Sequence, residues 1–276
     1  MDNAIIPFTK IPFIVTMPHS GEKVPESCDW LKGLPEEILM CDVDRYIDIL
    51  YEKSLIELKI PSVKTEWHRY AVDLNRIPED IDEDSVMGSE NKSGLHPRGY
   101  HWVMTTFEHK LMQRPMSVNH HNDLTNLIYE PFHNDVKALY QHFKKTNPIV
   151  FHLDAHSMPS VGTKMHKDPG QRRADIVVSD CLGKSCGVQY KDLVVKAYEN
   201  AGFKVAYNWP YMGGRVTEQY GHPSQGQQAL QVELNRDLYM NELSKKIKPD
   251  YVEVQKKIFQ ALNDIKTQLA NIQIDV

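Results

Sequence analysis

The chain has 276 residues, of which 41% are hydrophobic, and its formal net charge at pH 7 is −5. A chain of this length can bury a sizeable core, and we interpret residues 1–276 as one domain. The mild acidity gives no support for a nucleic-acid partner, and the lack of a long apolar run or a secretory leader predicts a cytoplasmic protein that does not contact a membrane.

Short apolar, β-branched runs predict the strands. Several of them are apolar at consecutive positions, which is typical of strands buried on both faces of a sheet. In chain order, the expected strands are residues 12–16, 62–65, 70–74, 149–153, 176–179, 204–207 and 230–234.

Longer stretches with helical periodicity alternate with these runs. Between residues 36 and 58, apolar side chains recur at steps of three and four, which predicts a helix with a core-facing stripe. The expected helices are residues 36–58, 128–145, 190–201 and 251–269. This alternation indicates an α/β fold with a central mixed, largely parallel sheet flanked by helices. The polar, acidic stretch 78–98 is interpreted as a long loop that borders a site.

Polar side chains with reactive chemistry end or follow several of the expected strands. In open α/β sheets ligands bind beyond the carboxyl ends of the strands, so we expect these side chains to meet there. In chain order they are His19, Glu22, Asn75, Arg76, His156 and Glu233. After residues 204–207, the paired glycines Gly213 and Gly214 let the backbone approach a ligand closely.

Two of these residues, His19 and His156, are suited to bind a metal ion. A catalytic zinc commonly takes two histidines and a carboxylate and leaves the fourth position for water. The carboxylate is either Glu22, three residues after His19, or Asp44 at the polar edge of the first expected helix. Glu233 is the candidate base that activates the water, because a carboxylate on a buried strand is costly without a partner.

The remaining polar side chains are less specific. Arg76 can bind a substrate carboxylate through two parallel hydrogen bonds, or it can pair with Asp73. The four cysteines include no CxxC pair, which argues against zinc bound by sulfur and predicts reduced thiols. Manganese, iron or cobalt could occupy the same donors as zinc. Five further histidines are interpreted as solvated surface groups: His120, His121, His133, His142 and His166.

Several longer motifs occur in a fixed order along most of the chain. They are MPHSG (17–21), RYAVDLNR (69–76), LDAHSMPS (153–160), PYMGGRVTEQYG (210–221) and LQVELNRDLYM (230–240). This ordered set resembles the N-formylglutamate amidohydrolase family, whereas a single piece such as PHSG or DLNR is only weakly specific. That family is similar in turn to the zinc carboxypeptidases, whose pattern includes HxxE, a DLNR-like segment, a distal histidine followed by serine, and a base glutamate on a late strand.

The resemblance implies a single metallohydrolase domain with a carboxypeptidase-like α/β sheet and one Zn²⁺ per chain. The implied reaction cleaves the formyl amide of N-formyl-L-glutamate, a small-molecule substrate of histidine catabolism, to formate and glutamate. The implied roles are zinc ligation by His19 and His156, base and then acid catalysis by Glu233, and a carboxylate clamp at Arg76.

The resemblance leaves the third metal ligand open. The position of Glu22 is not reliably acidic in the family, whereas an acid near Asp44 recurs. Arg69, or a backbone N–H of the glycine turn, is expected to stabilise the oxyanion. The residues expected to bind the substrate are Asn75, Arg76, Tyr211, Gly213, Gly214 and Arg215.

Two other functions are consistent with the sequence. A zinc carboxypeptidase, or a deacylase acting on another acyl amino acid or a cell-wall peptide, would share the metal site and differ in a pocket shaped by residues 78–98 and 162–173. A non-catalytic binding protein of the same fold is the other, although the intact set of two histidines, acid, arginine and Glu233 argues against it. A formyl and an acetyl pocket differ by one methyl group, so the acyl group is left open.

Overall fold

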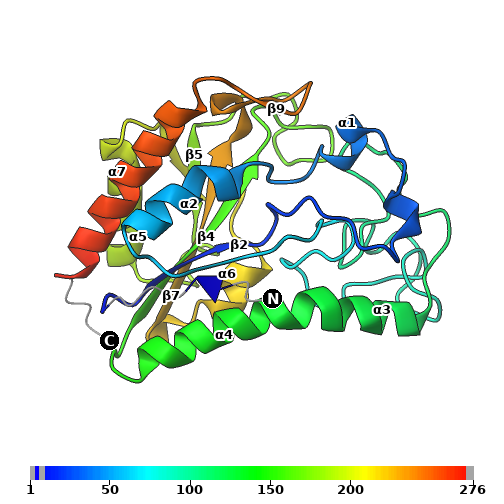
Figure 1. Ribbon diagram of the computed structural model, residues 1–276, viewed down its shortest axis with the longest axis horizontal. Helices are drawn as coiled ribbons and strands as arrows, with labels where there is room; N and C mark the ends of the chain where they lie inside the picture. Colours follow the sequence, from blue (N-terminus) through cyan, green and yellow to red (C-terminus); the bar gives the residue numbers. More distant parts are fainter. Residues whose placement is uncertain (1–3, 6–9, 272–276) are drawn as a thin grey trace.

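A mixed β-sheet forms the centre of the molecule (Figure 1). The structure is a computed structural model that describes residues 4–5 and 10–271. Within these residues the sheet has seven strands in the order β1-β3-β2-β4-β7-β5-β6. The strands are β1 (Ala4–Ile5), β2 (Phe13–Met17), β3 (Ser62–Lys64), β4 (Val150–Met158), β5 (Ile176–Ser179), β6 (Val205–Tyr207) and β7 (Gln227–Asn235). Only the β1–β3 and β5–β7 pairs among them are antiparallel, so the expected mixed, largely parallel sheet is confirmed.

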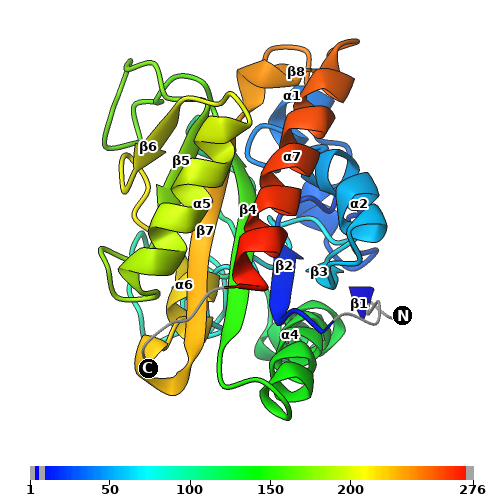
Figure 2. The ribbon, with the colours of Figure 1, turned by 90° about the vertical axis from the view of Figure 1, so that its left-hand side faces the viewer.

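Helices cover both faces of this sheet. α2 (Ile47–Glu57), α5 (Val188–Asn200) and α7 (Tyr251–Leu269) pack on one face around the larger core. Figure 2 shows α5 and α7 in front of the strands. α4 (Glu130–Lys144) and long loops cover the opposite face around a second core. The helical layers expected beside the sheet are therefore present.

Shorter elements connect these layers. They are α1 (Glu36–Leu39), α3 (Val118–Leu124), α6 (Arg215–Tyr220), the 3-10 turns Asp29–Leu31, Pro223–Gln225 and Arg236–Leu238, the π-helical turn Thr125–Tyr129, and a hairpin of β8 (Met240–Asn241) with β9 (Lys246–Ile247).

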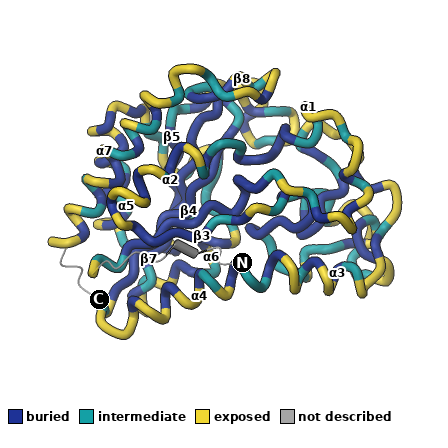
Figure 3. Tube along the Cα trace, in the orientation of Figure 1, coloured by how far each residue is buried: buried dark blue, intermediate teal, exposed yellow. Residues whose placement is uncertain are grey.

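The central strands β2, β4 and β7 carry different chemistry on their two faces. Because successive side chains of a strand point to opposite faces, Val15, Leu153 and Val232 pack toward α2, α5 and α7. Toward the carboxyl ends of these strands, the intervening positions are polar and buried: Thr16, His152, Asp154, His156, Gln231 and Glu233. Figure 3 shows the trace buried along β4 and β7. A row of polar groups is therefore enclosed on the face that α4 covers.

Residues 70–74 form no strand, so that expectation is wrong. Tyr70, Val72 and Leu74 are nevertheless buried in the core on the α4 side. The apolar run reflects the burial of an irregular segment, which periodicity cannot distinguish from a short buried strand.

Two helices, α1 and α2, replace the single helix expected over residues 36–58. Between them, Tyr46 adopts a left-handed backbone conformation with φ of 71°. The backbone N–H of Asp44 donates to the carbonyl of His19 at 3.0 Å. This bond joins the segment to the turn after β2, so Asp44 lies in a break between helices rather than at the edge of one.

Two of the histidines interpreted as solvated are buried, so that interpretation is wrong for them. His121, on the unexpected helix α3, is 9% exposed and hydrogen-bonds to His101 at 2.9 Å. His133, on α4, is fully buried and hydrogen-bonds to the hydroxyl of Tyr220 at 2.9 Å. His142 is exposed, as expected.

The four cysteines are free thiols, as expected. Burial raises the pKa of both Cys28 and Cys41 to about 12, so these two remain protonated and unreactive near neutral pH. Along residues 4–5 and 10–271, no helix is long and apolar enough to cross a membrane.

The contact between α2 and α5 contains a testable pair. The buried hydroxyls of Tyr51 and Tyr198 hydrogen-bond to each other at 2.9 Å. Tyr51→Phe leaves the other hydroxyl without this partner and should lower the free energy of unfolding by about 1–3 kcal/mol. The double variant with Tyr198→Phe removes both polar groups and should recover part of that loss. Urea unfolding measures this cycle, and strictly additive losses would contradict the pairing.

Candidate functional site

A cavity of about 260 Å³ lies where β2, β4 and β7 end. Most residues expected to form a site line it: His19, Asp44, Arg69, Asn75, Arg76, His156, Tyr211, Gly213, Gly214 and Glu233. Glu22 and Arg215 are not among its lining residues. The loops expected to border the site contribute Arg98, Met165 and His166. The strand-end argument thus leads to one common place, although residues 70–74 are not a strand.

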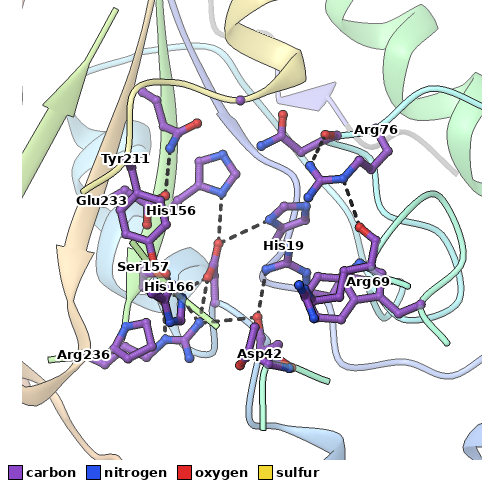
Figure 4. Close-up of a pocket in the computed structure, with 18 of the residues that line it drawn as sticks. His19, Asp42, Arg69, Arg76, His156, Ser157, His166, Tyr211, Glu233 and Arg236 are labelled. Atoms are coloured by element: carbon purple, nitrogen blue, oxygen red, sulfur yellow. Dashed lines mark hydrogen bonds and ion pairs between the residues drawn. The ribbon is translucent and has the colours of Figure 1, made fainter. Parts of the chain in front are cut away.

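Three buried side chains at the centre of this cavity form a cluster with the spacing of a metal site. His19, Asp44 and His156 each offer one ligand atom, and these atoms lie within 4.8 Å of one another. Asp44 Oδ2 is 3.0 Å from His156 Nδ1 and 3.6 Å from His19 Nδ1. Figure 4 shows the two imidazoles approaching the same carboxylate from different sides.

Two further carboxylates hold the outer nitrogens of these histidines. Asp73 Oδ1 lies 2.7 Å from His19 Nε2, and Asp154 Oδ2 lies 2.7 Å from His156 Nε2. A carboxylate there keeps the proton on Nε2 and leaves the Nδ1 lone pair for a metal. His19 Nδ1 is buried without a hydrogen-bond partner, as expected for a nitrogen that ligates a metal ion. The residues present therefore fit a divalent metal ion.

The charge of Asp44 is held by a network of donors. Arg236 Nη2 and Ser157 Oγ donate to its Oδ1, each at 3.1 Å. Burial alone raises the pKa of Asp44, but the two neighbouring histidines hold it well below the usual range. Burial likewise lowers the pKa of His156, but Asp154 raises it well above the usual value. Because a nitrogen must give up its proton to bind a metal, a metal ion at these donors would displace any proton on the ligating nitrogens.

Glu22 occupies a different environment from Asp44. Its carboxylate accepts from Arg45 Nε at 2.8 Å, and its side chain is 38% exposed. Arg45 also pairs with Glu36 and donates to the backbone carbonyl of Lys245. Of the two candidate carboxylates, the structure brings Asp44 to the histidines and places Glu22 outside the cavity.

Glu233 stands on β7 directly opposite His156 on β4. The side-chain amide of Gln231 donates to its Oε1 at 2.8 Å. Burial raises the pKa of Glu233 to about 7; the positive charge of His156 opposes this rise, and the negative charge of Asp44 adds to it. A carboxyl group that titrates near neutral pH can accept and return a proton under physiological conditions.

Two arginines face the cavity without an acidic partner in the part of the chain that the structure describes. Arg76 donates to the backbone carbonyls of Arg98 and Asn75, at 3.1 and 2.7 Å, and the alternative pairing with Asp73 does not form. Nη1 of Arg98 is buried and unpaired. Guanidinium groups with unused donors are suited to bind carboxylates. Arg98 was missed because a loop arginine carries no local signal of its partners.

Arg69 is fixed more firmly than Arg76 and Arg98. Its Nη1 donates to the carbonyl of Asp42 and its Nη2 to Asp73 Oδ2, each at 2.9 Å. The guanidinium lies over the ring of Trp102, 4.6 Å from the centroid. Its Nε is buried without a partner.

The turn before α6 forms one wall of the cavity. A Cβ at Gly214 would lie 2.1 Å from Nδ2 of Asn75, so only glycine allows this close approach. Asn75 Oδ1 in turn accepts from the backbone N–H of Val216 at 2.7 Å. Tyr211 accepts from Arg173 through its hydroxyl at 3.0 Å. Arg215 is exposed, and its Nη1 lies 3.7 Å from Oε2 of Glu218, so the structure does not bring Arg215 to the cavity.

His166 lines the cavity, so its interpretation as a solvated histidine is wrong. The backbone N–H of Thr163 donates to His166 Nδ1 at 3.0 Å, so Nδ1 carries no proton. Burial, with the nearby charge of Arg173, lowers the pKa of His166 to about 4 and keeps the ring neutral. A neutral His166 therefore carries its proton on Nε2.

Comparison with known proteins identifies relatives of this chain. The model of the N-formylglutamate amidohydrolase family matches residues 11–240. N-formylglutamate deformylase of Pseudomonas aeruginosa is 29% identical over 240 residues, 84% of each chain. The enzyme of the same name from Pseudomonas putida is 26% identical over 235 residues, which are 84% of this chain and 83% of that one. The resemblance drawn from the motifs is thus confirmed.

A solved structure agrees with these sequence matches. The crystal structure of N-formylglutamate amidohydrolase from Ralstonia eutropha JMP134 has a TM-score of 0.84 and 25% identity, and the match covers 97% of this chain and 99% of that one. A structure from Agrobacterium tumefaciens, with a TM-score of 0.69 and 18% identity, shares the fold.

The pKa of Glu233 predicts how the metal-free protein responds to pH. Its usual value of 4.5 is raised to about 7 on folding, so stability should fall as pH rises between these values. Glu233→Gln removes this ionisation. In chelator, the variant should melt at a higher temperature than the wild type at about pH 8 and at a similar temperature at about pH 4. Thermal unfolding measures both, and a lower melting temperature of the variant at about pH 8 would contradict the assignment.

Proposed function

This chain belongs to the N-formylglutamate amidohydrolase family, and on that premise we propose that it hydrolyses the formyl amide of N-formyl-L-glutamate to formate and L-glutamate. As a member of this family, it is an enzyme that hydrolyses an amide bond. The observation that carries the substrate assignment is the pair Arg76 and Arg98, which line the cavity of the metal-type cluster and have no acidic partner among the described residues. Two guanidinium groups suit a substrate with two carboxylates.

We assign the metal site to His19, Asp44 and His156, with one Zn²⁺ per chain. Two imidazole nitrogens and one carboxylate are the donor set typical of catalytic zinc, and outer carboxylates orient both rings. When bound, the ion supplies Lewis acidity that lowers the pKa of water and polarises a carbonyl group. Glu22 is left out because its carboxylate pairs with Arg45 outside the cavity.

Glu233 is assigned as base and then acid. It lines the cavity opposite His156, and its pKa of about 7 in the metal-free protein suits proton transfer near neutral pH. Its carboxylate takes a proton from the attacking water. It then passes this proton to the glutamate nitrogen as the C–N bond breaks.

Arg69 is assigned to the negative charge that develops on the amide oxygen. Its guanidinium is already oriented by Asp42 and Asp73 and therefore needs no rearrangement during the reaction. A backbone N–H of Gly213 or Gly214 is the alternative donor.

The glutamate half of the substrate is assigned to the opposite wall. Arg76 and Arg98 bind its carboxylates, and Asn75 and Tyr211 shape the wall beside the glycine turn. Arg215 is left out because it is exposed and lies beside Glu218.

Metal content and formate release from the same preparations test the proposed function. The wild type should hold about one zinc per chain and release formate from N-formyl-L-glutamate. His156→Ala removes a ligand and should lose both, whereas exposed His142→Ala should lose neither. Glu233→Gln separates metal binding from proton transfer, because this variant should keep the zinc while turnover falls by about 10²-fold or more.

Each outcome of this experiment points to one assignment. Zinc without formate would contradict the substrate. A wild type that takes up no zinc would contradict the metal site, and retained turnover in Glu233→Gln would contradict the base.

Arg98 provides a separate test of the carboxylate assignment. Arg98→Met removes a hydrogen-bond donor to a charged group, so the KM for N-formyl-L-glutamate should rise about tenfold or more. Arg114→Met, at an exposed arginine outside the cavity, is the matched control and should leave KM unchanged. Steady-state kinetics with both variants measures this effect. An unchanged KM in Arg98→Met would remove Arg98 from the substrate site.

A further inference from the structure

A second chamber of about 640 Å³ adjoins the cavity that holds the cluster. The two spaces share Thr106, Pro159 and Arg236 as lining residues. Figure 4 places Arg236 and Arg76 on opposite sides of His19. A substrate whose glutamate half lies at Arg76, with its amide at the cluster, therefore directs its acyl half toward the chamber.

A formyl group would not use this space. Beyond its carbonyl carbon it carries only a hydrogen atom, so N-formyl-L-glutamate would leave the chamber empty of substrate. The chamber lining includes two apolar side chains, Phe107 and Val161, which are 49% and 42% exposed. Such side chains suit contact with methylene groups of a longer acyl chain.

One cationic side chain of the chamber, Lys245, has a largely buried stem and an ammonium without a partner among the described residues. Lys245 is 9% exposed, and its Nζ makes no hydrogen bond or ion pair with any residue in the described ranges 4–5 and 10–271. Glu242 also lines the chamber, but both of its carboxylate oxygens already accept from Ser160. An accessible ammonium that no acidic side chain of the described residues neutralises is suited to pair with a carboxylate of a ligand.

The position of Lys245 is fixed by the fold rather than by its side-chain contacts. Its backbone is left-handed, with φ of 57°, a conformation that is uncommon for a non-glycine residue. Its carbonyl accepts from Arg45 Nη1 at 2.9 Å and from the hydroxyl of Tyr46 at 3.1 Å. Arg45 is anchored in turn by Glu22. These contacts hold the backbone of Lys245 at the position from which its side chain reaches the chamber.

We propose that the chamber binds the acyl half of N-acyl-L-glutamates whose acyl chain ends in a carboxylate, with that carboxylate paired to Lys245. The proposal rests on the proposed amidohydrolase function and widens its substrate class. The reaction stays the same: the oxygen of one water bonds to the acyl carbon as the C–N bond breaks. Both protons of that water end on the glutamate nitrogen, which leaves as an ammonium group, and the acyl group leaves as a dicarboxylate.

Three substrates in one assay test this inference: N-formyl-, N-butanoyl- and N-succinyl-L-glutamate. The butanoyl and succinyl chains have equal numbers of carbons and differ in the terminal carboxylate. In the wild type, kcat/KM for the succinyl compound should exceed that for the butanoyl compound about tenfold or more, as expected for a hydrogen bond between charged groups. Binding of both to the Glu233→Gln variant, measured by calorimetry, should show the same preference.

Substitutions at two adjacent lysines test whether Lys245 causes the preference for the succinyl compound. Lys245→Met keeps the aliphatic stem and should abolish the succinyl preference, whereas Lys245→Arg should retain it. Lys246→Met, at an exposed lysine outside the chamber, is the matched control and should leave the preference unchanged. The preference is a ratio within one preparation, so partial unfolding of a variant does not alter it.

The outcomes separate the two proposals. Formate release without a succinyl preference, or an equal preference in Lys245→Met, would overturn the inference and leave the proposed function standing. If none of the three compounds is hydrolysed, both the proposed function and the inference would be overturned.

Discussion

Thr16, Asp154 and Gln231 lie side by side across β2, β4 and β7, and His156 pairs with Glu233 two positions further along. All five side chains share one face of the sheet, while the other face is apolar and packs on α2, α5 and α7. The site depends on this register, because a slip by one residue would turn the polar row into the apolar core. The hydroxyl of Thr16 donates to Asp154, which holds His156, so even the ring nitrogen facing Asp44 is set by strand pairing.

Burying this many charges is unfavourable unless nearly all of them are paired. Asp73 is held by His19 and Arg69, and Asp44 is held by Arg236 and Ser157. The exceptions are informative, since His19, Arg69 and Arg98 each keep a buried nitrogen without a partner at the same cavity. In a protein that satisfies most of its buried polar atoms, unsatisfied atoms that converge on one space indicate where a ligand belongs.

Local patterns predicted the elements whose burial is uniform. β5 and α7 have the bounds expected from sequence, because each is a continuous apolar run or a regular stripe. Asp154 was also predictable in principle, since it stands two residues before His156 on one strand and so shares its face. The choice between Glu22 and Asp44 as the metal ligand was not predictable, because it depends on a break between helices and on partners distant in sequence. The same limit applies to Arg98, whose role is visible only once its loop folds over the sheet.

The contact between Asp44 and Arg236 joins residues that are 192 positions apart. A ribosome makes a chain from its N-terminus, so Asp44 is synthesised long before Arg236. β7 follows β4, β5 and β6 in the chain but lies between β4 and β5 in the sheet. A growing chain that lacks β7 therefore has neither a strand between β4 and β5 nor the hydrogen bond from Arg236 to Asp44. The arrangement of His19, Asp44 and His156 becomes available only after most of the polypeptide has been made, which delays any capture of a metal ion until the fold can hold it.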